Sequence, residues 1–323
     1  MTRRFASCLA ALFVMTAAPS AFAQQETLPE DVPLRENFSP TQMTIVGAGF
    51  AGAVFFQFFG SDVFGHPSPG MGPPAEDSVD WRYTHHVNPN PDPSKKWLGG
   101  VPDLGGYFLP AGAMSFYLTG TIGAGVSDDF FLSTRKHELM AFTGAFSWSM
   151  VTVNALKLIV GRTRPFAVRE DVDPDAFGED EKEQYISFPS GHSASAAATM
   201  TFLALDLSDE LFHGALADAS PAVRYGVGRA LPIITGAGVT WMVMYSRIRD
   251  QKHWLSDTLT GAMIGAGFSA LFYSRHFDHE GNPRRNFPSR EGAAGIIDAA
   301  STGRLYLQPT PNGPMGLGYG FEF

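Results

Sequence analysis

Three groups of polar residues stand at the ends of long apolar stretches, and their residue types suit the chemistry of a tetrahedral anion. The first group lies in KLIVGRTRP, the second in PSGH and the third in SRIRDQKHWLSD. The motif residues are Lys157, Arg164 and Pro165 in the first group, Pro189, Ser190, Gly191 and His192 in the second, and Ser246, Arg247, His253 and Asp257 in the third. Guanidinium forks and ammonium groups bind tetrahedral oxyanions well.

The second group is expected to begin a helix, because an alanine-rich run follows it directly. Free N–H groups in the first turn of a helix attract anions, and Gly191 would allow a ligand close to the backbone. Ser190 alone would be explained as a helix cap. Together with Lys157, Arg164 and Arg247, these two residues predict a binding site for a phosphate-like group.

The two histidines indicate catalysis as well as binding. His253 and Asp257 are four residues apart, so they share one face of a helix. A carboxylate on one ring nitrogen would fix the tautomer and leave the other nitrogen as a nucleophile. His192 would protonate the leaving oxygen as a general acid. The pair His253–Asp257 alone would be explained as a surface pair, but the three groups in this order favour a site.

The motifs K-x6-RP, PSGH and SR-x5-H-x3-D resemble the three-part signature of the type 2 phosphatidic acid phosphatase (PAP2) superfamily, which class A acid phosphatases and vanadium haloperoxidases share. The resemblance covers about residues 104 to 273. It implies a helical bundle and metal-independent hydrolysis through a phosphohistidine. It also implies His253 as the nucleophile, Asp257 as its orienting partner and His192 as the leaving-group acid. The implied phosphate-binding residues are Lys157, Arg164, Ser190, Gly191 and Arg247.

Three classes of function therefore stay open at this stage. We predict the first, an exported phosphatase without a cofactor that acts on phosphomonoesters, pyrophosphates or lipid phosphates, and keep the other two as alternatives. The second is a vanadate-dependent haloperoxidase, in which His253 would bind vanadium and His192 would act on bound peroxide. Vanadate and phosphate are both tetrahedral, so the motifs do not separate these two. The third is a non-enzymatic envelope protein.

Six apolar segments are expected to position these residues. Each exceeds the usual length of a strand, and alanine, leucine, methionine and glycine dominate them, so helices are favoured. The segments are residues 44–59, 104–126, 139–160, 193–207, 227–248 and 256–273. Alternate ends of antiparallel helices lie on one face of a bundle, so the motifs should meet there. We predict an all-α fold of about six helices, with close helix contact at Gly261-x-x-x-Gly265.

The rest of the chain predicts four regions. Arg3, Arg4, the apolar residues 5–18 and an A-x-A site predict a signal peptide over residues 1–23. Residues 24–100 would hold a linker, one apolar helix and a Pro/Gly-rich loop over 60–100, with His85-His86 solvated. Residues 101–280 would form the phosphatase domain, and their acidic stretch 168–184 a solvated loop at the rim of the site. Alternation in residues 281–323 predicts a β-hairpin.

Charge and cysteine content limit the partners and the compartment. A formal net charge of −9 at pH 7 disfavours nucleic acid. The single cysteine, Cys8, lies in the predicted signal, so disulfides and zinc–thiolate sites are excluded from the mature chain. If all six segments spanned a membrane after a cleaved signal, Lys157 and Arg164 would lie in the cytoplasm. We therefore expect export to the periplasm or envelope as a soluble or membrane-associated bundle, with integral insertion left open.

Overall fold

A computed structural model describes residues 38, 40–64, 70–89, 104–124, 130–169, 181–277, 281, 304–308 and 316–320. The chain divides into two units, Met1–Pro283 and Arg284–Phe323. The predicted signal peptide and most of the acidic stretch lie outside the described residues. The first unit contains all three motifs, so its helices position the candidate site.

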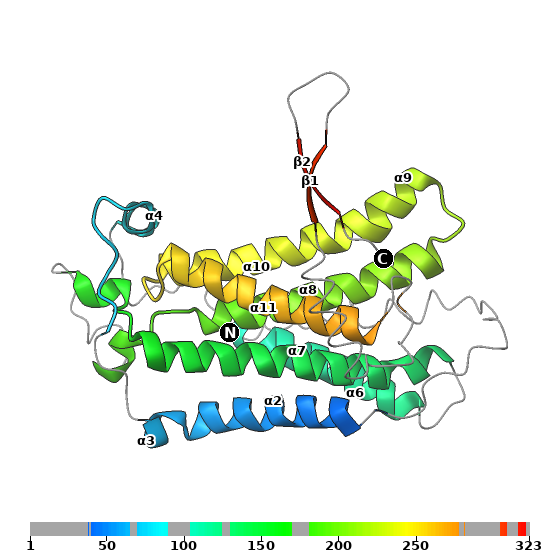
Figure 1. Cartoon of the computed structure of the whole chain (residues 1–323), viewed down its shortest axis with the longest axis horizontal. Helices are drawn as coiled ribbons and strands as arrows, with labels where there is room; N and C mark the ends of the chain where they lie inside the picture. The colour runs from blue at the N-terminus through cyan, green and yellow to red at the C-terminus, as the bar shows by residue number, and fades with distance from the viewer. Residues whose placement is uncertain are drawn as a thin grey trace, which may run out of the picture. The chain divides into compact units, whose positions relative to one another are not determined.

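Long helices dominate the first unit (Figure 1). They are α2 (Pro40–Phe58), α6 (Leu109–Ala124), α7 (Phe130–Val160), α8 (Gly191–Asp209), α10 (Leu231–Arg249) and α11 (Leu255–His276). Shorter helical turns adjoin them: η3 (Leu104–Phe108), η4 (Pro165–Val168), η6 (Glu181–Tyr185), η7 (Glu210–Ala215), α9 (Pro221–Val223) and η8 (Arg224–Ala230). Each of the six predicted segments contains one long helix, which confirms the predicted helical bundle.

Helix α8 lies at the centre of the bundle, packed against α6, α7, α10 and α11. Its residues 193–200 are all buried. The alanine-rich sequence explains this position, since alanine favours the helix and its small side chain lets neighbouring helices come close. Three turns into α8, the ring of Phe202 makes edge-to-face contacts with Tyr117, Phe142 and Tyr273 at centroid distances of 5.8, 5.5 and 5.4 Å.

The closest helix contact joins α11 to α8 through a stripe of small residues. A Cβ on Gly261 would overlap the carbonyl oxygen of Ser190, the residue that caps α8. A Cβ on Gly265 would overlap the carbonyl oxygen of Ala194. One turn further, the Ser269 hydroxyl donates to the Ala198 carbonyl at 2.6 Å. The predicted close contact at the Gly-x-x-x-Gly motif is confirmed, and it fixes the start of α8 against α11.

The prediction of a long loop over residues 60–100 is wrong in part, because this segment contains α3 (Gly60–Phe64) and α4 (Val79–Val87). Ser78 caps α4, its hydroxyl accepting from the Trp81 amide at 3.1 Å. His85 therefore lies on a helix, half-buried and stacked on Trp81 at a centroid distance of 4.3 Å, while His86 is exposed. Aromatic packing stabilises this short helix, and its mostly polar sequence does not predict that packing.

The chain just before α4 pairs with the first motif. The Gly70 amide donates to the Gly161 carbonyl at 3.0 Å, and the Met71 amide donates to the Val160 carbonyl at 3.0 Å. The Thr163 amide in turn donates to the Met71 carbonyl at 3.1 Å. These hydrogen bonds place the segment leading to α4 beside the stretch that carries the arginines of the first motif.

The second unit is described only at two strands. These are β1 (Arg304–Gln308) and β2 (Gly316–Gly320), paired antiparallel with Arg304 opposite Gly320 and Gln308 opposite Gly316. The strands lie in the segment where the alternation predicts a hairpin, and both the hairpin and its role stay predictions.

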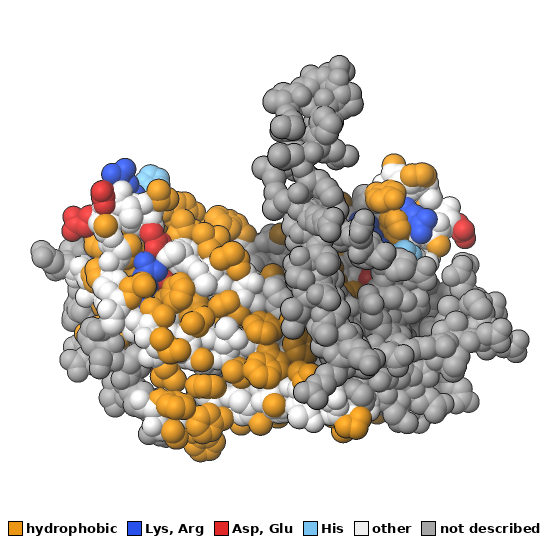
Figure 2. Space-filling model, in the orientation of Figure 1, with side chains coloured by type: hydrophobic (Ala, Val, Ile, Leu, Met, Phe, Trp, Pro, Cys, Tyr) orange, Lys and Arg blue, Asp and Glu red, His pale blue; other side chains and the backbone are white. Residues whose placement is uncertain are grey.

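Much of the helical surface of the first unit is apolar. Among the described residues, three helical stretches are long and apolar enough to cross a membrane: Pro40–Phe58, Arg135–Val168 and Pro221–Arg249. Figure 2 shows apolar side chains over the flank of the helices, with charged side chains gathered toward the ends. Phe58, Ile234 and Met263 are 68%, 67% and 66% exposed. A water-soluble surface rarely exposes so many large apolar groups together.

Candidate active site

The three motifs meet at one end of the bundle. Lys157 lies in the last turn of α7, Arg247 lies in the last turn of α10, and Ser190 caps α8. The charges of the neighbouring motif residues act on the ring of His253: these are Arg164, Arg247, Lys157 and His192. A Cβ on Gly191 would lie 3.7 Å from Lys157 Nζ. The structure thus brings the predicted site residues together, as expected for alternate helix ends.

His253 is fully buried, and its orientation is fixed by the backbone of Ser187. Its Nδ1 lies 2.6 Å from the Ser187 carbonyl oxygen. A carbonyl only accepts, so Nδ1 carries the proton and Nε2 keeps the lone pair. Asp257 Oδ2 lies 3.9 Å from Nδ1, beyond hydrogen-bonding distance. The direct hydrogen bond expected between His253 and Asp257 is therefore replaced by one to the Ser187 carbonyl.

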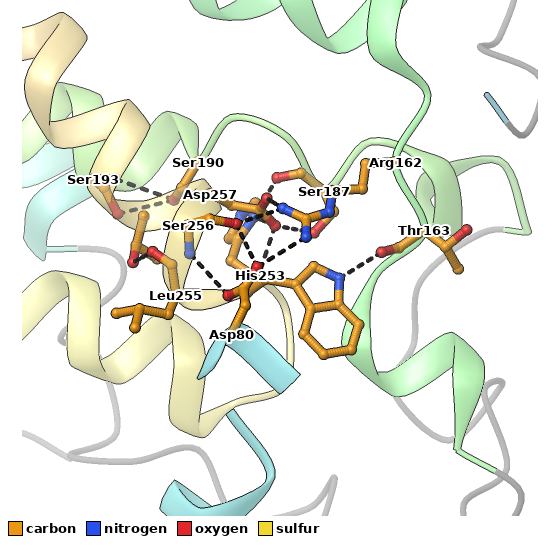
Figure 3. Close-up of polar contacts among 12 residues, drawn as sticks. Asp80, Arg162, Thr163, Ser187, Ser190, Ser193, His253, Leu255, Ser256 and Asp257 are labelled. Atoms are coloured by element: carbon orange, nitrogen blue, oxygen red, sulfur yellow. Dashed lines mark hydrogen bonds and ion pairs between the residues drawn. The ribbon is translucent and has the colours of Figure 1, made fainter. Parts of the chain in front are cut away.

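Asp257 holds the residues around His253 in place (Figure 3). Its Oδ2 accepts from the Ser187 hydroxyl at 2.5 Å and from the Trp254 amide at 3.0 Å. Its Oδ1 accepts from Arg162 Nη1 at 2.5 Å. Ser187 thus contacts Asp257 through its hydroxyl and His253 through its carbonyl. The carboxylate acts on the imidazole by its nearby charge and through Ser187.

Burial and the surrounding cations determine the protonation of His253. Burial lowers the pKa of His253 well below its ordinary value, and the charges of Arg164, Arg247, Lys157 and His192 lower it further. The imidazole is therefore neutral at pH 7 with a free lone pair on Nε2. Such a group surrounded by cations is suited to attack an electrophile that carries negative charge.

Asp257 experiences opposing effects on its ionisation. Burial raises the pKa of Asp257 and is the largest effect. The Arg162 charge and the hydrogen bonds from Ser187 and Trp254 lower it, and the net direction is upward. Since burial disfavours the carboxylate, its ionised form depends on the positive partner that Arg162 supplies.

Ser190 is both a helix cap and a wall of the site. Its hydroxyl accepts from the Ser193 amide at 3.4 Å and from the Ser193 hydroxyl at 3.0 Å. Its own amide donates to the Asp257 carbonyl at 3.0 Å, so the start of α8 is joined to the start of α11. The structure confirms Ser190 as the cap of α8. The next N–H groups of α8 are a source of anion affinity.

His192 packs beneath the π-helical turn η3. A Cβ on Gly106 would lie 2.6 Å from His192 Cδ2 and 2.8 Å from Nε2, so the glycine backbone closely approaches the ring. The Tyr107 ring meets His192 edge-on at a centroid distance of 5.9 Å. The Ser195 hydroxyl donates to the Gly106 carbonyl at 3.4 Å and fastens η3 to α8. Only glycine at residue 106 leaves the ring its place.

One side of the site carries part of the acidic stretch. Glu183 Oε2 lies 3.9 Å from Arg164 Nη2 and is half-exposed. The Arg164 amide donates to the Gln184 carbonyl at 2.8 Å. The described end of the stretch thus borders the site, as the sequence predicts for its rim.

A separate carboxylate group lies at the other end of α7. Glu138, Asp206 and Glu210 are the one group of metal-ligand type found close together among the described residues. Arg135 forms ion pairs with all three, at 2.5 Å to Glu138 and 3.5 Å to Asp206. An arginine already fills this position, and Tyr117 donates to Asp206 at 2.8 Å. The cluster is an internal charge network, away from the three motifs.

The sequence does not predict four residues at the site: Asp80, Gly106, Arg162 and Ser187. Arg162 and Ser187 lie inside or beside the recognised motifs, but spacing alone does not tell which way their side chains point. Asp80 and Gly106 come from distant segments, and only the folded chain brings them to the site. The one local signal is Ser78, a capping residue that could have predicted α4 and with it Asp80.

Comparison with known proteins finds similarity over the part of the chain that carries the motifs. Residues 138–280 match the model of the PAP2 superfamily. The chain is 30% identical over 145 residues to a PA-phosphatase related-family protein of Dictyostelium discoideum, covering 44% of this chain and 49% of that one. It is 33% identical over 149 residues to "Probable lipid phosphate phosphatase 4" of Arabidopsis thaliana, covering 41% and 46%. The stretch that carries the three motifs is thus similar to the PAP2 superfamily, and the chain spans about half the length of these relatives.

A solved structure resembles the chain more distantly. The crystal structure of Aquifex aeolicus LpxE has a TM-score of 0.41 and 19% sequence identity, covering 62% of this chain and 98% of that one. The similarity to the PAP2 superfamily is carried by the sequence match over residues 138–280 and by the three motifs.

Proposed function

We propose that this protein is a membrane-associated phosphatase that hydrolyses phosphate esters, with lipid phosphates as the favoured substrate class, through a phosphohistidine on His253. The observation that carries the proposal is the buried neutral imidazole of His253, with Nε2 unprotonated and four positive or titratable groups acting on it. The match to the PAP2 model supports phosphate-ester chemistry, and the name of the similar Arabidopsis thaliana protein, a probable lipid phosphate phosphatase, supplies the lipid phosphate class.

The first step is attack on phosphorus. Nε2 of His253 forms a bond to the phosphoryl group, and the bond between phosphorus and the leaving oxygen breaks. His192 gives its proton to that oxygen. Lys157, Arg164 and Arg247 balance the charge on the phosphoryl oxygens, with the first N–H groups of α8. The Ser187 carbonyl and the Asp257 carboxylate stabilise the positive charge that develops on the His253 ring.

The second step releases phosphate. Neutral His192 takes a proton from water, the water oxygen bonds to phosphorus, and the bond between phosphorus and His253 Nε2 breaks. Inorganic phosphate leaves, and both histidines return to their starting states. The roles need only groups of this chain, so the proposal includes no metal and no cofactor.

The apolar surface supports a membrane setting. The exposed large apolar groups of α2 and α10 lie on stretches that could cross a bilayer. A lipid phosphate would present its head group at the helix ends, where the three motifs meet. Export to the periplasm remains part of the proposal and depends on the signal predicted in residues 1–23.

One assay tests the proposed reaction. The purified chain is incubated with p-nitrophenyl phosphate and with a phosphatidic acid in mixed micelles, each with EDTA, beside His253→Ala. We expect phosphate release from both substrates that EDTA leaves unchanged and that His253→Ala abolishes. Phosphate release that persists in His253→Ala would refute the proposed nucleophile. Bromide oxidation with vanadate and peroxide, without phosphate release, would favour the haloperoxidase alternative.

A further inference from the structure

Behind the nucleophile, a buried arginine joins two carboxylates from distant parts of the chain. Arg162 Nη1 donates to Asp257 Oδ1 at 2.5 Å, and Arg162 Nη2 donates to Asp80 Oδ2 at 2.9 Å. The side chains of Arg162 and Asp257 are 7% and 0% exposed, and that of Asp80 is 16% exposed. Figure 3 draws the contacts of Arg162 with the two carboxylates as dashed lines. We call these three side chains the Arg162 bridge.

Ser256 fastens the bridge to the start of α11. Its amide donates to Asp80 Oδ1 at 3.0 Å, and its hydroxyl donates to Asp80 Oδ2 at 2.5 Å. Arg162 Nη1 also donates to the Ser256 hydroxyl at 2.6 Å. Asp80 thus satisfies a free N–H group in the first turn of α11, where a negative charge is favourable. The bridge thus contacts the first turn of α11, which carries Asp257, at both Ser256 and Asp257.

The bridge reaches His253 through Ser187. The Ser187 hydroxyl donates to Asp257 at 2.5 Å, its amide donates to the Arg162 carbonyl at 3.0 Å, and its carbonyl accepts from His253. Ser187 is therefore held on two sides by members of the Arg162 bridge. A shift of either member would move the one carbonyl that fixes the tautomer of His253.

We propose that Asp80 and Arg162 are positioning residues for the nucleophile. They hold Asp257 in place as a carboxylate, and Asp257 with Ser187 then keeps Nε2 of His253 unprotonated and directed at phosphorus. This inference rests on the proposed function where it is tested by enzyme kinetics. Neither residue is among the proposed phosphate-binding groups, so both would act through Asp257.

The charges around the bridge set the sign of the expected pH effect. Asp257 faces Arg162 and His253, and Arg162 also faces Asp80. His253 in turn is acted on by cations and titratable groups of α7, the 161–164 stretch, α8 and α10: Lys157, Arg164, His192 and Arg247. Without the Arg162 cation, the pKa of Asp257 would rise further, because burial would act unopposed. A protonated Asp257 no longer stabilises the charge on His253 during attack.

The kinetic test compares Arg162→Gln, Arg162→Lys and Asp80→Asn with wild type, using p-nitrophenyl phosphate. We expect kcat to fall about 10-fold to 100-fold in Arg162→Gln and about 10-fold in Asp80→Asn, the range for groups that act through a reacting residue. KM should change less than about 3-fold, since no phosphate contact is lost. The acidic limb of the kcat profile should move to higher pH in Arg162→Gln. Arg162→Lys should recover part of kcat, because it keeps the charge.

Arg169→Gln is the matched control. Arg169 also ties the end of α4 to the chain, donating to the carbonyls of Asn88 at 3.3 Å and Pro89 at 2.7 Å, but it does not contact Asp257. We expect Arg169→Gln to keep the kcat and pH profile of wild type. If Asp80→Asn and Arg162→Gln lower only the melting temperature and keep the wild-type kcat and pH profile, as we expect of Arg169→Gln, the bridge is merely structural and the proposal is overturned. If Arg162→Gln does not fold, Asp80→Asn and Arg162→Lys decide.

A second readout separates this inference from the proposed reaction. The imidazole nitrogen resonances of His253, assigned by their loss in His253→Gln, report its tautomer and protonation without substrate. We expect them to move in Asp80→Asn and Arg162→Gln and to stay in place in Arg169→Gln. If wild type releases no phosphate but these shifts occur, the proposed function fails and the bridge stands. Unchanged resonances in both bridge variants would overturn the inference.

Discussion

At the scale of single residues, the low pKa of His253 has a direct consequence for the pH profile. The neutral imidazole is the reactive form, so activity requires a pH above its pKa. Burial and four nearby groups lower that pKa well below 6.5, its ordinary value. We expect the acidic limb of kcat/KM, which reports the free enzyme, to lie below pH 6.5.

Removal of one cation should move that limb in a known direction. In Lys157→Ala the imidazolium form of His253 loses a repulsive neighbour, so its pKa rises and the acidic limb moves toward higher pH. The same substrate is used for both proteins, so its own titration cancels in the comparison. A limb that stays in place, or moves to lower pH, would show that Lys157 does not act on His253.

His192 allows a test by leaving group. A nitrophenolate leaves without a proton, whereas an alkoxide needs one. We expect His192→Asn to lower kcat for an alkyl phosphate about 100-fold more than for p-nitrophenyl phosphate, within the range of general acid catalysis. The ratio of the two rates is the measurement. Equal losses on both substrates would contradict the assignment of His192 as the leaving-group acid.

The sequence predicts the phosphate-binding and histidine residues of the site, but it does not predict how they are held. Lys157, Arg247 and His253 follow from residue type and position at helix ends. The hydrogen bond from His253 to a backbone carbonyl does not, because spacing i, i+4 indicates a shared face and gives no distance. Asp80 reaches Arg162 across 82 residues of chain. Such a contact leaves no local pattern in the sequence.

At the scale of elements, the α8–α11 contact makes a prediction for stability. Gly265→Ala would place a Cβ on the Ala194 carbonyl and push the two helices apart, which should lower the free energy of unfolding by about 1 to 3 kcal/mol. Gly267 on the same helix is exposed, with no atom within 4 Å of an added Cβ. Gly267→Ala should therefore raise stability by up to about 1 kcal/mol. Thermal unfolding of both variants is the measurement.

A Gly265→Ala variant more stable than Gly267→Ala would contradict the α8–α11 contact.

The sequence predicts this contact from two glycines four residues apart, and it predicts the six long helices from their length and composition. It does not predict α4, whose nine residues are mostly polar. That helix is stable in its place because Trp81 stacks on Trp254 and Asp80 binds the start of α11.

At the scale of the whole molecule, the apolar flank makes a prediction about the lipid environment. Trp241 on α10 is 47% exposed, whereas Trp254 is fully buried. In vesicles with brominated acyl chains, we expect the Trp241 fluorescence to be quenched. Trp241→Phe should remove most of the quenching, and Trp254→Phe should leave it. Quenching that is unaffected by Trp241→Phe would show that this face of α10 does not contact lipid.

In such a bilayer, the order of the elements would place the whole site on one side of the membrane. The motifs lie at the ends of α7 and α10 and at the starts of α8 and α11, so one surface would receive every substrate. Which compartment that surface faces depends on the export signal predicted in residues 1–23, and cell fractionation tests it.

The central claim is covalent catalysis by His253, and trapping the intermediate tests it most directly. Wild type and His253→Gln are mixed with ³²P-labelled p-nitrophenyl phosphate, quenched within milliseconds and digested. The account predicts label on the peptide that contains His253, lost in acid and stable in base, and no label in His253→Gln. Label on another residue, or turnover in wild type without any protein-bound phosphate at that time, would contradict it.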